Sequence, residues 1–255
     1  MPHRTLTNFQ IAVIIAAMLA ALAMTWGDLT MLGMVAFVFV IVVGLGVAIP
    51  QFSFFGPYVC RGNTSRRCVA LTFDDGPDAS STPVLLELLR NAKVEATFFC
   101  IGKRVEANAE LVARILREGH LLENHSYAHS NTTNFFSVKR LRNDLAQAQT
   151  AIEQATGIAP KCFRPPMGLS NPRVFRVARA LGLTVVGWSA RGFDTRVTNP
   201  ERIVAQITRS LGPGAIILLH DGNIPPERLV ATVKLLLDRL HKLGYEVVRL
   251  DRLLT

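Results

Sequence analysis

Two adjacent carboxylates, Asp74 and Asp75, stand at the end of an apolar run and are followed by Gly76 and Pro77. An apolar run that ends in turn-forming residues is typical of a buried strand and its closing turn. Two neighbouring carboxylates repel each other, so a fold that keeps both needs a cation or a proton to separate their roles. The pair therefore points to acid–base or metal chemistry at the end of a strand, although Asp-Gly-Pro is also ordinary turn chemistry.

A second group of reactive side chains is formed by His125 and His129. On one helical turn, this spacing of four residues aims two imidazoles at one point. Two histidines and a carboxylate around an open coordination position are the pattern of a hydrolytic metal site. The alternative is a pair of ordinary surface or core histidines.

Further polar residues follow later apolar runs. Arg164 follows one run, Trp188 leads from another into Asp194, and His220 ends a third. Separately, Arg164 reads as a surface cation, Asp194 as a turn residue and His220 as the cap of a buried strand. Their joint occurrence at successive strand ends favours one shared site. The other histidines are expected to be incidental: His3, His120 and His241.

Short apolar runs alternate with longer amphipathic ones from residue 67 onward. The predicted strands are 67–73, 94–101, 120–124, 160–164, 183–189, 215–220 and 245–250. The predicted helices are 83–92, 104–118, 137–156, 171–181, 199–211 and 226–243. This alternation predicts a parallel sheet, and seven strands fit an irregular (β/α)7 barrel better than an open sheet. The polar clusters then lie at the carboxyl ends of the strands, where barrels carry their active sites. No Gly-x-Gly-x-x-Gly follows the first strand, which argues against a dinucleotide site.

The first fifty residues are mostly apolar, with runs at about 11–26 and 31–49. A membrane-spanning helix needs about 20 apolar residues, with about 17 as the lower end. We therefore predict a transmembrane helical hairpin over 1–50, an aromatic and proline-bracketed linker over 51–66, and a catalytic domain over 67–255. A cleavable signal peptide is the alternative, but no small-x-small cleavage site precedes the second apolar run.

The formal net charge of +9 is spread over scattered Lys and Arg residues without a nucleic-acid motif. Proximity to an anionic membrane surface explains it more simply than nucleic acid does. Arg4 precedes the first apolar run, and Arg61, Arg66 and Arg67 follow the second. The positive-inside rule then places both ends, and the catalytic domain, on the cytoplasmic face of a bacterial-type inner membrane. If only one run spans, the domain lies on the periplasmic or extracellular face.

The cysteines form no Cys-x-x-Cys pair, and four of them in 255 residues are no disulfide framework. Cys100 lies in an apolar run, where a buried free thiol is expected. Cys60 and Cys68 are close enough in sequence to form a disulfide, but nothing in the sequence requires one.

Together these motifs resemble the polysaccharide deacetylase (NodB homology) family, carbohydrate esterase family 4, over about residues 67–250. The matching segments are Thr-Phe-Asp-Asp-Gly-Pro at 72–77, His-Ser-Tyr-Ala-His at 125–129, Arg-Pro-Pro-Met-Gly at 164–168, Asp194, and Leu-Leu-His at 218–220. The resemblance implies catalytic roles for Asp74 as base, His220 as acid, Arg164 as the holder of the base and Asp194 as the partner of the acid. It also implies that one divalent metal is held by Asp75, His125 and His129.

Two positions depart from the family pattern. Met167 replaces the common aromatic of the third motif, but its backbone N–H is still expected to bind the oxyanion. Thr195 stands where a tryptophan often follows the fourth-motif aspartate, so one groove wall is expected to differ. Trp188 is the remaining expected substrate contact.

The resemblance, the residue chemistry and the apolar N-terminal runs together imply a membrane-anchored, metal-dependent deacetylase that hydrolyses the N-acetyl or N-formyl amide of an amino sugar. Its substrate is then a glycan or a lipid-linked saccharide. Zinc is the first expectation for the metal, with cobalt, nickel, manganese or iron as alternatives. A carboxylate-pair glycosidase is the competing enzyme, but it explains neither the two histidines nor the arginine motif. A non-catalytic membrane-bound glycan-binding protein is the third reading, and loss of one motif residue would have favoured it.

Overall fold

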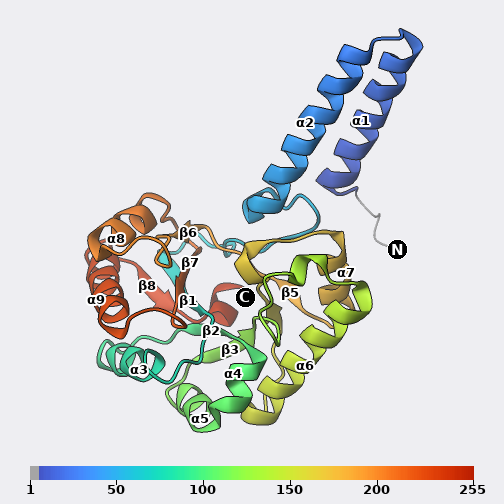
Figure 1. The fold of residues 1–255 in the computed structure, drawn as a ribbon. Coiled ribbons are helices and arrows are strands. Elements are labelled where there is room, and N and C mark those ends of the chain that lie inside the picture. Colours follow the sequence, from blue (N-terminus) through green and yellow to red (C-terminus); the bar gives the residue numbers. More distant parts are fainter. Residues whose placement is uncertain (1–5) are drawn as a thin grey trace.

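The computed structural model describes residues 6–255, so Arg4 and His3 lie outside the described residues. Its centre is a sheet of parallel strands in the order β5-β4-β3-β2-β1-β7-β6, with β8 paired to β1 (Figure 1). The strands are β1 (Cys68–Asp74), β2 (Thr97–Cys100), β3 (Leu121–Asn124), β4 (Cys162–Phe163), β5 (Thr184–Val185), β6 (Ala190–Arg191), β7 (Ala215–His220) and β8 (Glu246–Val248). The parallel strands form a half-barrel that fits the predicted (β/α) barrel, and we call this part of the chain the barrel.

The fifth predicted strand, 183–189, differs from the expectation because the chain divides it between two partners. β5 pairs with β4, whereas β6 pairs with β7. Between them, the Val186 N–H donates to the Phe163 carbonyl at 2.9 Å and the Ser189 N–H donates to the Ile216 carbonyl at 3.0 Å. Between β5 and β6 the chain passes through Gly187, where an added Cβ would lie 2.8 Å from the Cys60 sulfur. The described residues therefore form eight strands where the sequence predicts seven.

Helices surround the sheet close to their predicted positions (Figure 1). They are α3 (Thr82–Asn91), α4 (Gly102–Ala107), α5 (Ala109–Arg117), α6 (Val138–Thr156), α7 (Pro172–Ala180), α8 (Pro200–Arg209), α9 (Pro226–Lys242) and α10 (Leu250–Leu253). The predicted helix 104–118 is interrupted at Asn108, whose side chain donates to the Arg104 carbonyl at 2.8 Å. Asparagine competes with regular helical bonding in this way. Short 3₁₀ turns occur at η1 (Pro50–Phe52), η2 (Thr133–Phe135) and η3 (Pro166–Gly168).

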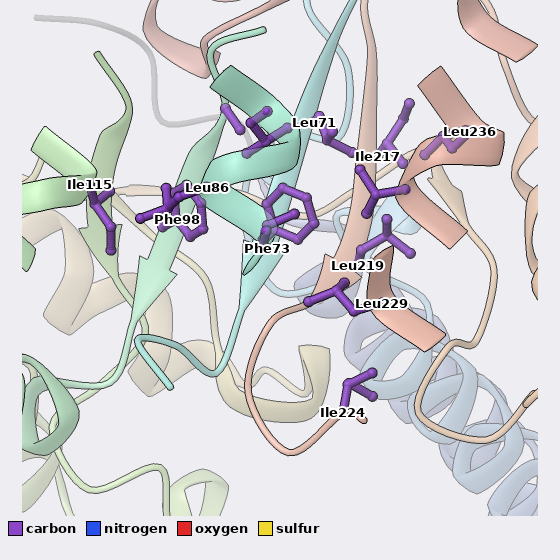
Figure 2. Packing of buried hydrophobic residues seen from close by; sticks show 14 of the residues in the cluster. Leu71, Phe73, Leu86, Phe98, Ile115, Ile217, Leu219, Ile224, Leu229 and Leu236 are labelled. Atoms are coloured by element: carbon purple, nitrogen blue, oxygen red, sulfur yellow. The ribbon is translucent and has the colours of Figure 1, made fainter. Parts of the chain in front are cut away.

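Strand β1 separates two layers of the core because alternate strand residues point to opposite faces. Leu71 and Phe73 belong to the cluster that packs between the sheet and helices α3 and α9 (Figure 2). Cys68 and Ala70 belong to a different cluster, shared with Leu218 of β7. By the same alternation, Asp74 shares its face with Cys68 and Ala70, on the side of β1 opposite Leu71 and Phe73.

The N-terminal residues form two antiparallel helices that project away from the barrel (Figure 1). Helix α1 (Asn8–Thr25) and helix α2 (Leu29–Ala48) are long and apolar enough to cross a membrane. Only 6% of the apolar window of each is buried within the structure, unlike a core helix of a globular domain. They are therefore candidate membrane spans or signal-sequence helices on length, composition and exposure.

The segment between hairpin and barrel packs on both. Phe54 is buried, and its carbonyl accepts from the Phe9 N–H at 2.9 Å. Gln51 donates through Nε2 to the Trp188 carbonyl at 2.8 Å. Further along, Val59 forms a parallel bridge with Val186. Residues 51–66, expected as a linker, therefore seat the base of the hairpin on the barrel.

All four cysteines are free. Cys100 is fully buried, as the sequence predicts. Cys60 and Cys68, whose pairing the sequence leaves open, are not bridged in the structure.

Candidate active site

The carboxyl ends of β1 and β7 bring an acid and a histidine to one place. The two strands pair in parallel with Asp74 in register with His220. Asp75 has a left-handed backbone, with φ of 72°. Adjacent residues of a regular strand point to opposite faces, and this conformation breaks the alternation. Both carboxylates consequently line one cavity of about 260 Å³.

Arg164 is fully buried and fixes Asp74. Its Nη1 donates to Asp74 Oδ1 at 2.6 Å and to Thr72 Oγ1 at 2.8 Å. Its Nη2 donates to the Gly187 carbonyl at 2.9 Å. The guanidinium carbon also lies 4.0 Å from the centre of the Phe99 ring. The reading of Arg164 as a surface cation is therefore wrong, and Asp74 Oδ1 is held in one orientation.

Asp75, His125 and His129 converge on a single point. Asp75 Oδ1 lies 3.3 Å from His125 Nε2 and 3.1 Å from His129 Nε2. The ligand atoms of the three residues all lie within 4.8 Å of one another. Among residues 6–255, Asp75 Oδ1 is buried and makes no hydrogen bond. A buried carboxylate oxygen facing two imidazole nitrogens is a donor set that fits a divalent cation.

The orientation of His125 is set by a backbone carbonyl. His125 Nδ1 lies 2.8 Å from the Arg164 carbonyl oxygen. Because a carbonyl can only accept, Nδ1 carries a proton, so in the neutral ring the lone pair of Nε2 faces Asp75. Metal-binding histidines commonly use this arrangement.

The expectation that His125 and His129 share a helical turn is wrong, because residues 125–129 form a loop. Ser126 and His129 have φ of 68° and 46°, in the left-handed region. Side-chain oxygens replace the helical acceptors: Asn124 Oδ1 accepts from the Ser126 N–H at 2.8 Å. Asp144 of α6 accepts from the N–H groups of the next two residues at 3.1 and 3.2 Å. The loop, rather than a helix, brings the two imidazole rings to a separation of 4.9 Å.

Burial and neighbouring charges shift the pKa values of Asp75, His125 and His129. Burial raises the pKa of Asp75, but the neighbouring His125 and His129 outweigh it and hold that pKa well below its usual range. Burial lowers the pKa of His125, but Asp74 and Asp75 outweigh it and raise that pKa. Burial and the charge of His125 lower the pKa of His129. The site therefore favours positive charge between the two histidines and Asp75, which a bound cation would also supply.

His220 is held by Asp194 at two points. Asp194 Oδ1 lies 3.0 Å from His220 Nδ1, and Oδ2 accepts from the His220 N–H at 2.8 Å. Burial lowers the pKa of His220, but the hydrogen bond and charge of Asp194 outweigh it and raise that pKa to about 9. The imidazole is consequently a protonated acid at neutral pH. Asp194 is thus more than a turn residue.

Met167 and Trp188 line the same cavity. Met167 has a left-handed backbone with φ of 57°, and its side chain is half exposed. Trp188 is 5% exposed, and Gly168 packs directly against its ring. Thr195 is also part of the lining. Met167 and Thr195, the two residues that depart from the family pattern, therefore both line the catalytic cavity.

The structure brings all the predicted site residues to this cavity or into contact with it. The sequence analysis assigned no role to six further residues. Three of them line the cavity, and the other three hydrogen-bond to the residues around it: Arg191, Phe193 and Arg196, and Thr72, Asp144 and Gly187. Asp144 and Gly187 act through contacts distant in sequence, which leave no local signal. His120, expected to be incidental, accepts the Ala96 N–H at 3.1 Å in the barrel core.

Comparison with known proteins identifies consistent relatives. A family model described as polysaccharide deacetylase matches residues 61–186. A peptidoglycan-N-acetylglucosamine deacetylase of Bacillus cereus is 40% identical over 192 residues, which cover 74% of this chain and 89% of that protein. A peptidoglycan-N-acetylglucosamine deacetylase of Listeria monocytogenes is 36% identical over 197 residues, covering 77% of this chain but 41% of that longer protein.

The same fold occurs in a protein described as a pseudoenzyme. The crystal structure of a carbohydrate esterase family 4 pseudoenzyme from Bacillus anthracis superposes with a TM-score of 0.72 and 27% identity. The match covers 78% of this chain and 69% of that one. The fold alone therefore does not make a catalyst, and catalysis depends on the side chains of the site.

Proposed function

The chain belongs to the polysaccharide deacetylase family, and we propose that it hydrolyses the N-acyl amide of an amino sugar in a metal-dependent reaction. Its relatives are named deacetylases, which are hydrolases of carbon–nitrogen bonds other than peptide bonds. The observation that carries the proposal is the unpartnered, buried Asp75 Oδ1 between two imidazoles, beside an aspartate held by a buried arginine. A glycosidase needs none of these histidines.

Asp75, His125 and His129 would hold one divalent cation, with zinc as our first choice and cobalt, nickel, manganese or iron as alternatives. When bound, such a cation polarises an acyl carbonyl and lowers the pKa of water. The buried position and fixed tautomer of His125 support its assignment as a ligand. We take the acyl group to be acetyl or formyl, on an amino sugar of a glycan or a lipid-linked saccharide.

The chain's own groups then move the protons. Asp74 accepts a proton as water attacks the acyl carbon, because Arg164 holds Oδ1 and leaves Oδ2 free of that ion pair. The Met167 N–H donates to the developing oxyanion, and Trp188 forms a wall for the sugar. His220, held by Asp194, gives its proton to the departing amine. In the net reaction, one water molecule is added across the amide bond, which gives a carboxylic acid and an amine.

Metal removal provides the test of this function. Purified full-length protein in detergent is treated with EDTA, and release of acetate from tetra-N-acetylchitotetraose is measured. We expect activity to disappear and to return with about one equivalent of zinc. Glycosidic cleavage that persists in EDTA would favour the glycosidase instead. Glycan binding without any turnover after zinc is restored would favour a non-catalytic binding protein.

The acid role of His220 predicts a pH dependence. Because the folded pKa of about 9 lies above the ordinary 6.5, the His220–Asp194 interaction stabilises the fold fully below about pH 6.5. That contribution is lost as pH rises through about 9. The general acid is lost over the same range, so kcat/KM should fall with an apparent pKa near 9.

The Asp194→Asn variant should move this alkaline limb toward 6.5, because the charge that raises the pKa is gone. The measurement is a pH profile of kcat/KM for both proteins. An unchanged limb in the variant would exclude His220 as the titrating acid.

We further propose that α1 and α2 both cross a bacterial inner membrane and place the barrel on the cytoplasmic face. The exposed apolar surfaces of both helices support spanning. Arg61, Arg66 and Arg67 after α2 support the orientation by the positive-inside rule. A cytoplasm-only and a periplasm-only reporter are fused separately after Thr255. Signal from the cytoplasmic reporter is expected, and signal from the periplasmic reporter would reverse the orientation.

A further inference from the structure

A second cavity lies between the base of the hairpin and the barrel; we call it the junction cavity. It has a volume of about 450 Å³, within the usual range of ligand sites, about 300–1,000 Å³. One wall comes from the end of α2 and η1, over residues 48–51, and another from the end of α8. Its remaining wall includes Trp188, Arg191 and Phe193, which also line the catalytic cavity. The two cavities therefore adjoin at these three residues.

The junction cavity carries cationic groups without anionic partners. It is lined by Arg191 and Arg209, and neither has a carboxylate within 4.0 Å among the described residues 6–255. The Arg191 guanidinium lies 3.8 Å from the centre of the Phe193 ring, which holds its plane in place. Burial lowers the pKa of Arg191 and the charge of Arg196 lowers it further, against the opposing charge of Asp194. A bound anion would offset this cost.

A third polar group, Gln206, also lines the junction cavity. Its Oε1 atom is buried and, within residues 6–255, has no hydrogen-bond partner. Because an amide carries both donors and an acceptor, rotation of the side chain would present its NH₂ group to an anion. Two guanidinium groups and an amide are well suited to phosphate oxygens, since guanidinium binds them in a bidentate manner.

Taking the deacetylase function as its basis, we propose that the junction cavity binds the phosphate or diphosphate linkage of a lipid-anchored amino sugar. The sugar then occupies the catalytic cavity, and the lipid chain leaves beside α2. The location supports a lipid carrier, because the wall at 48–51 is the point where two exposed apolar helices join the barrel. A neutral glycan polymer has no group that would pair with Arg209.

Binding can be measured without turnover. The chain contains two tryptophans, Trp26 and Trp188, so Trp188 is the only fluorophore of its kind in a Trp26→Phe background. Full-length protein in detergent is titrated with farnesyl diphosphate, and quenching or enhancement of Trp188 emission is recorded. We expect saturable binding that Arg209→Gln weakens about tenfold. Arg202→Gln removes the same charge from the same helix outside the cavity and should leave the affinity unchanged.

Two further titrations separate the sources of the phosphate. Farnesol, which has the lipid chain alone, should cause no saturable change that depends on Arg209. If inorganic pyrophosphate binds as tightly as farnesyl diphosphate, the lipid part of the proposal is wrong. If farnesyl diphosphate does not bind, or binds equally to Arg209→Gln, the phosphate site is wrong.

Turnover separates this proposal from the deacetylase function itself. With zinc-loaded full-length protein, farnesyl-diphosphate-linked N-acetylglucosamine should show a KM at least about tenfold below that of tetra-N-acetylchitotetraose. Arg209→Gln should raise the KM for the first substrate about tenfold at unchanged kcat, and leave the second unaffected. If Arg209→Gln changes the KM for both substrates equally, or changes the KM for neither, the proposal is wrong. If neither substrate is deacetylated, the proposed function is wrong. The fluorescence titration then tests, independently of turnover, whether the junction cavity binds a lipid diphosphate.

Discussion

The Asp74→Asn variant is expected to lose about 10²- to 10⁴-fold in kcat for amide hydrolysis while its zinc content stays at one equivalent. An amide has the size of the carboxylate and leaves an oxygen for Arg164, but it cannot accept a proton from water. Asp74 is 3% exposed and its Oδ1 is fixed at 2.6 Å from Arg164 Nη1, so few other bases can replace it. Initial rates of acetate release, with zinc content measured on the same samples, provide the measurement.

The matched control for this variant is Asp238→Asn, the same substitution at an exposed position on α9. It should retain wild-type kcat. Circular dichroism of both variants separates lost chemistry from lost folding. Activity of Asp74→Asn within a few-fold of wild type, with normal folding and zinc content, would remove Asp74 from the role of base.

The Arg164→Met variant is expected to lose about 3–5 kcal/mol of the free energy of unfolding, because it leaves the buried Asp74 carboxylate without its counterion. Methionine can fill much of the space beside the Phe99 ring, so the loss comes mainly from the charge and its hydrogen bonds. Arg164 donates to Asp74, Thr72 and the Gly187 carbonyl, and all three contacts disappear together. Denaturant unfolding of the full-length protein in detergent, followed by circular dichroism, provides the measurement.

A double-mutant cycle identifies the ion pair as the cause. The cost of Arg164→Met should be smaller by about 0.5–3 kcal/mol when Asp74 is already Asn, because the carboxylate charge is then absent. Arg117→Met, at an exposed position on α5, is the control and should cost less than about 0.5 kcal/mol. A cost for Arg164→Met below about 1 kcal/mol would show that the pair behaves like an exposed salt bridge.

The sequence predicted the secondary structure well where local patterns are strong. Helices α3, α6 and α9 lie within a residue or two of their predicted ends, because each carries a regular apolar stripe. The pattern failed where a single side chain decides the backbone. Asn108 interrupts the helix predicted over 104–118, and side chains of Asn124 and α6 turn residues 125–129 into a loop.

By itself, the sequence determined which chemical groups stand at the ends of the strands, because apolar periodicity and turn residues are local properties of the chain. It also indicated two apolar helices before the barrel. How these groups meet depends on contacts between distant parts of the chain, which the folded structure reveals. The pairing of β1 with β7 places His220 beside Asp74, and Arg164 reaches Asp74 across 90 residues of sequence. The junction cavity likewise exists only because α2, α8 and the barrel come together, and no local pattern encodes such a long-range contact.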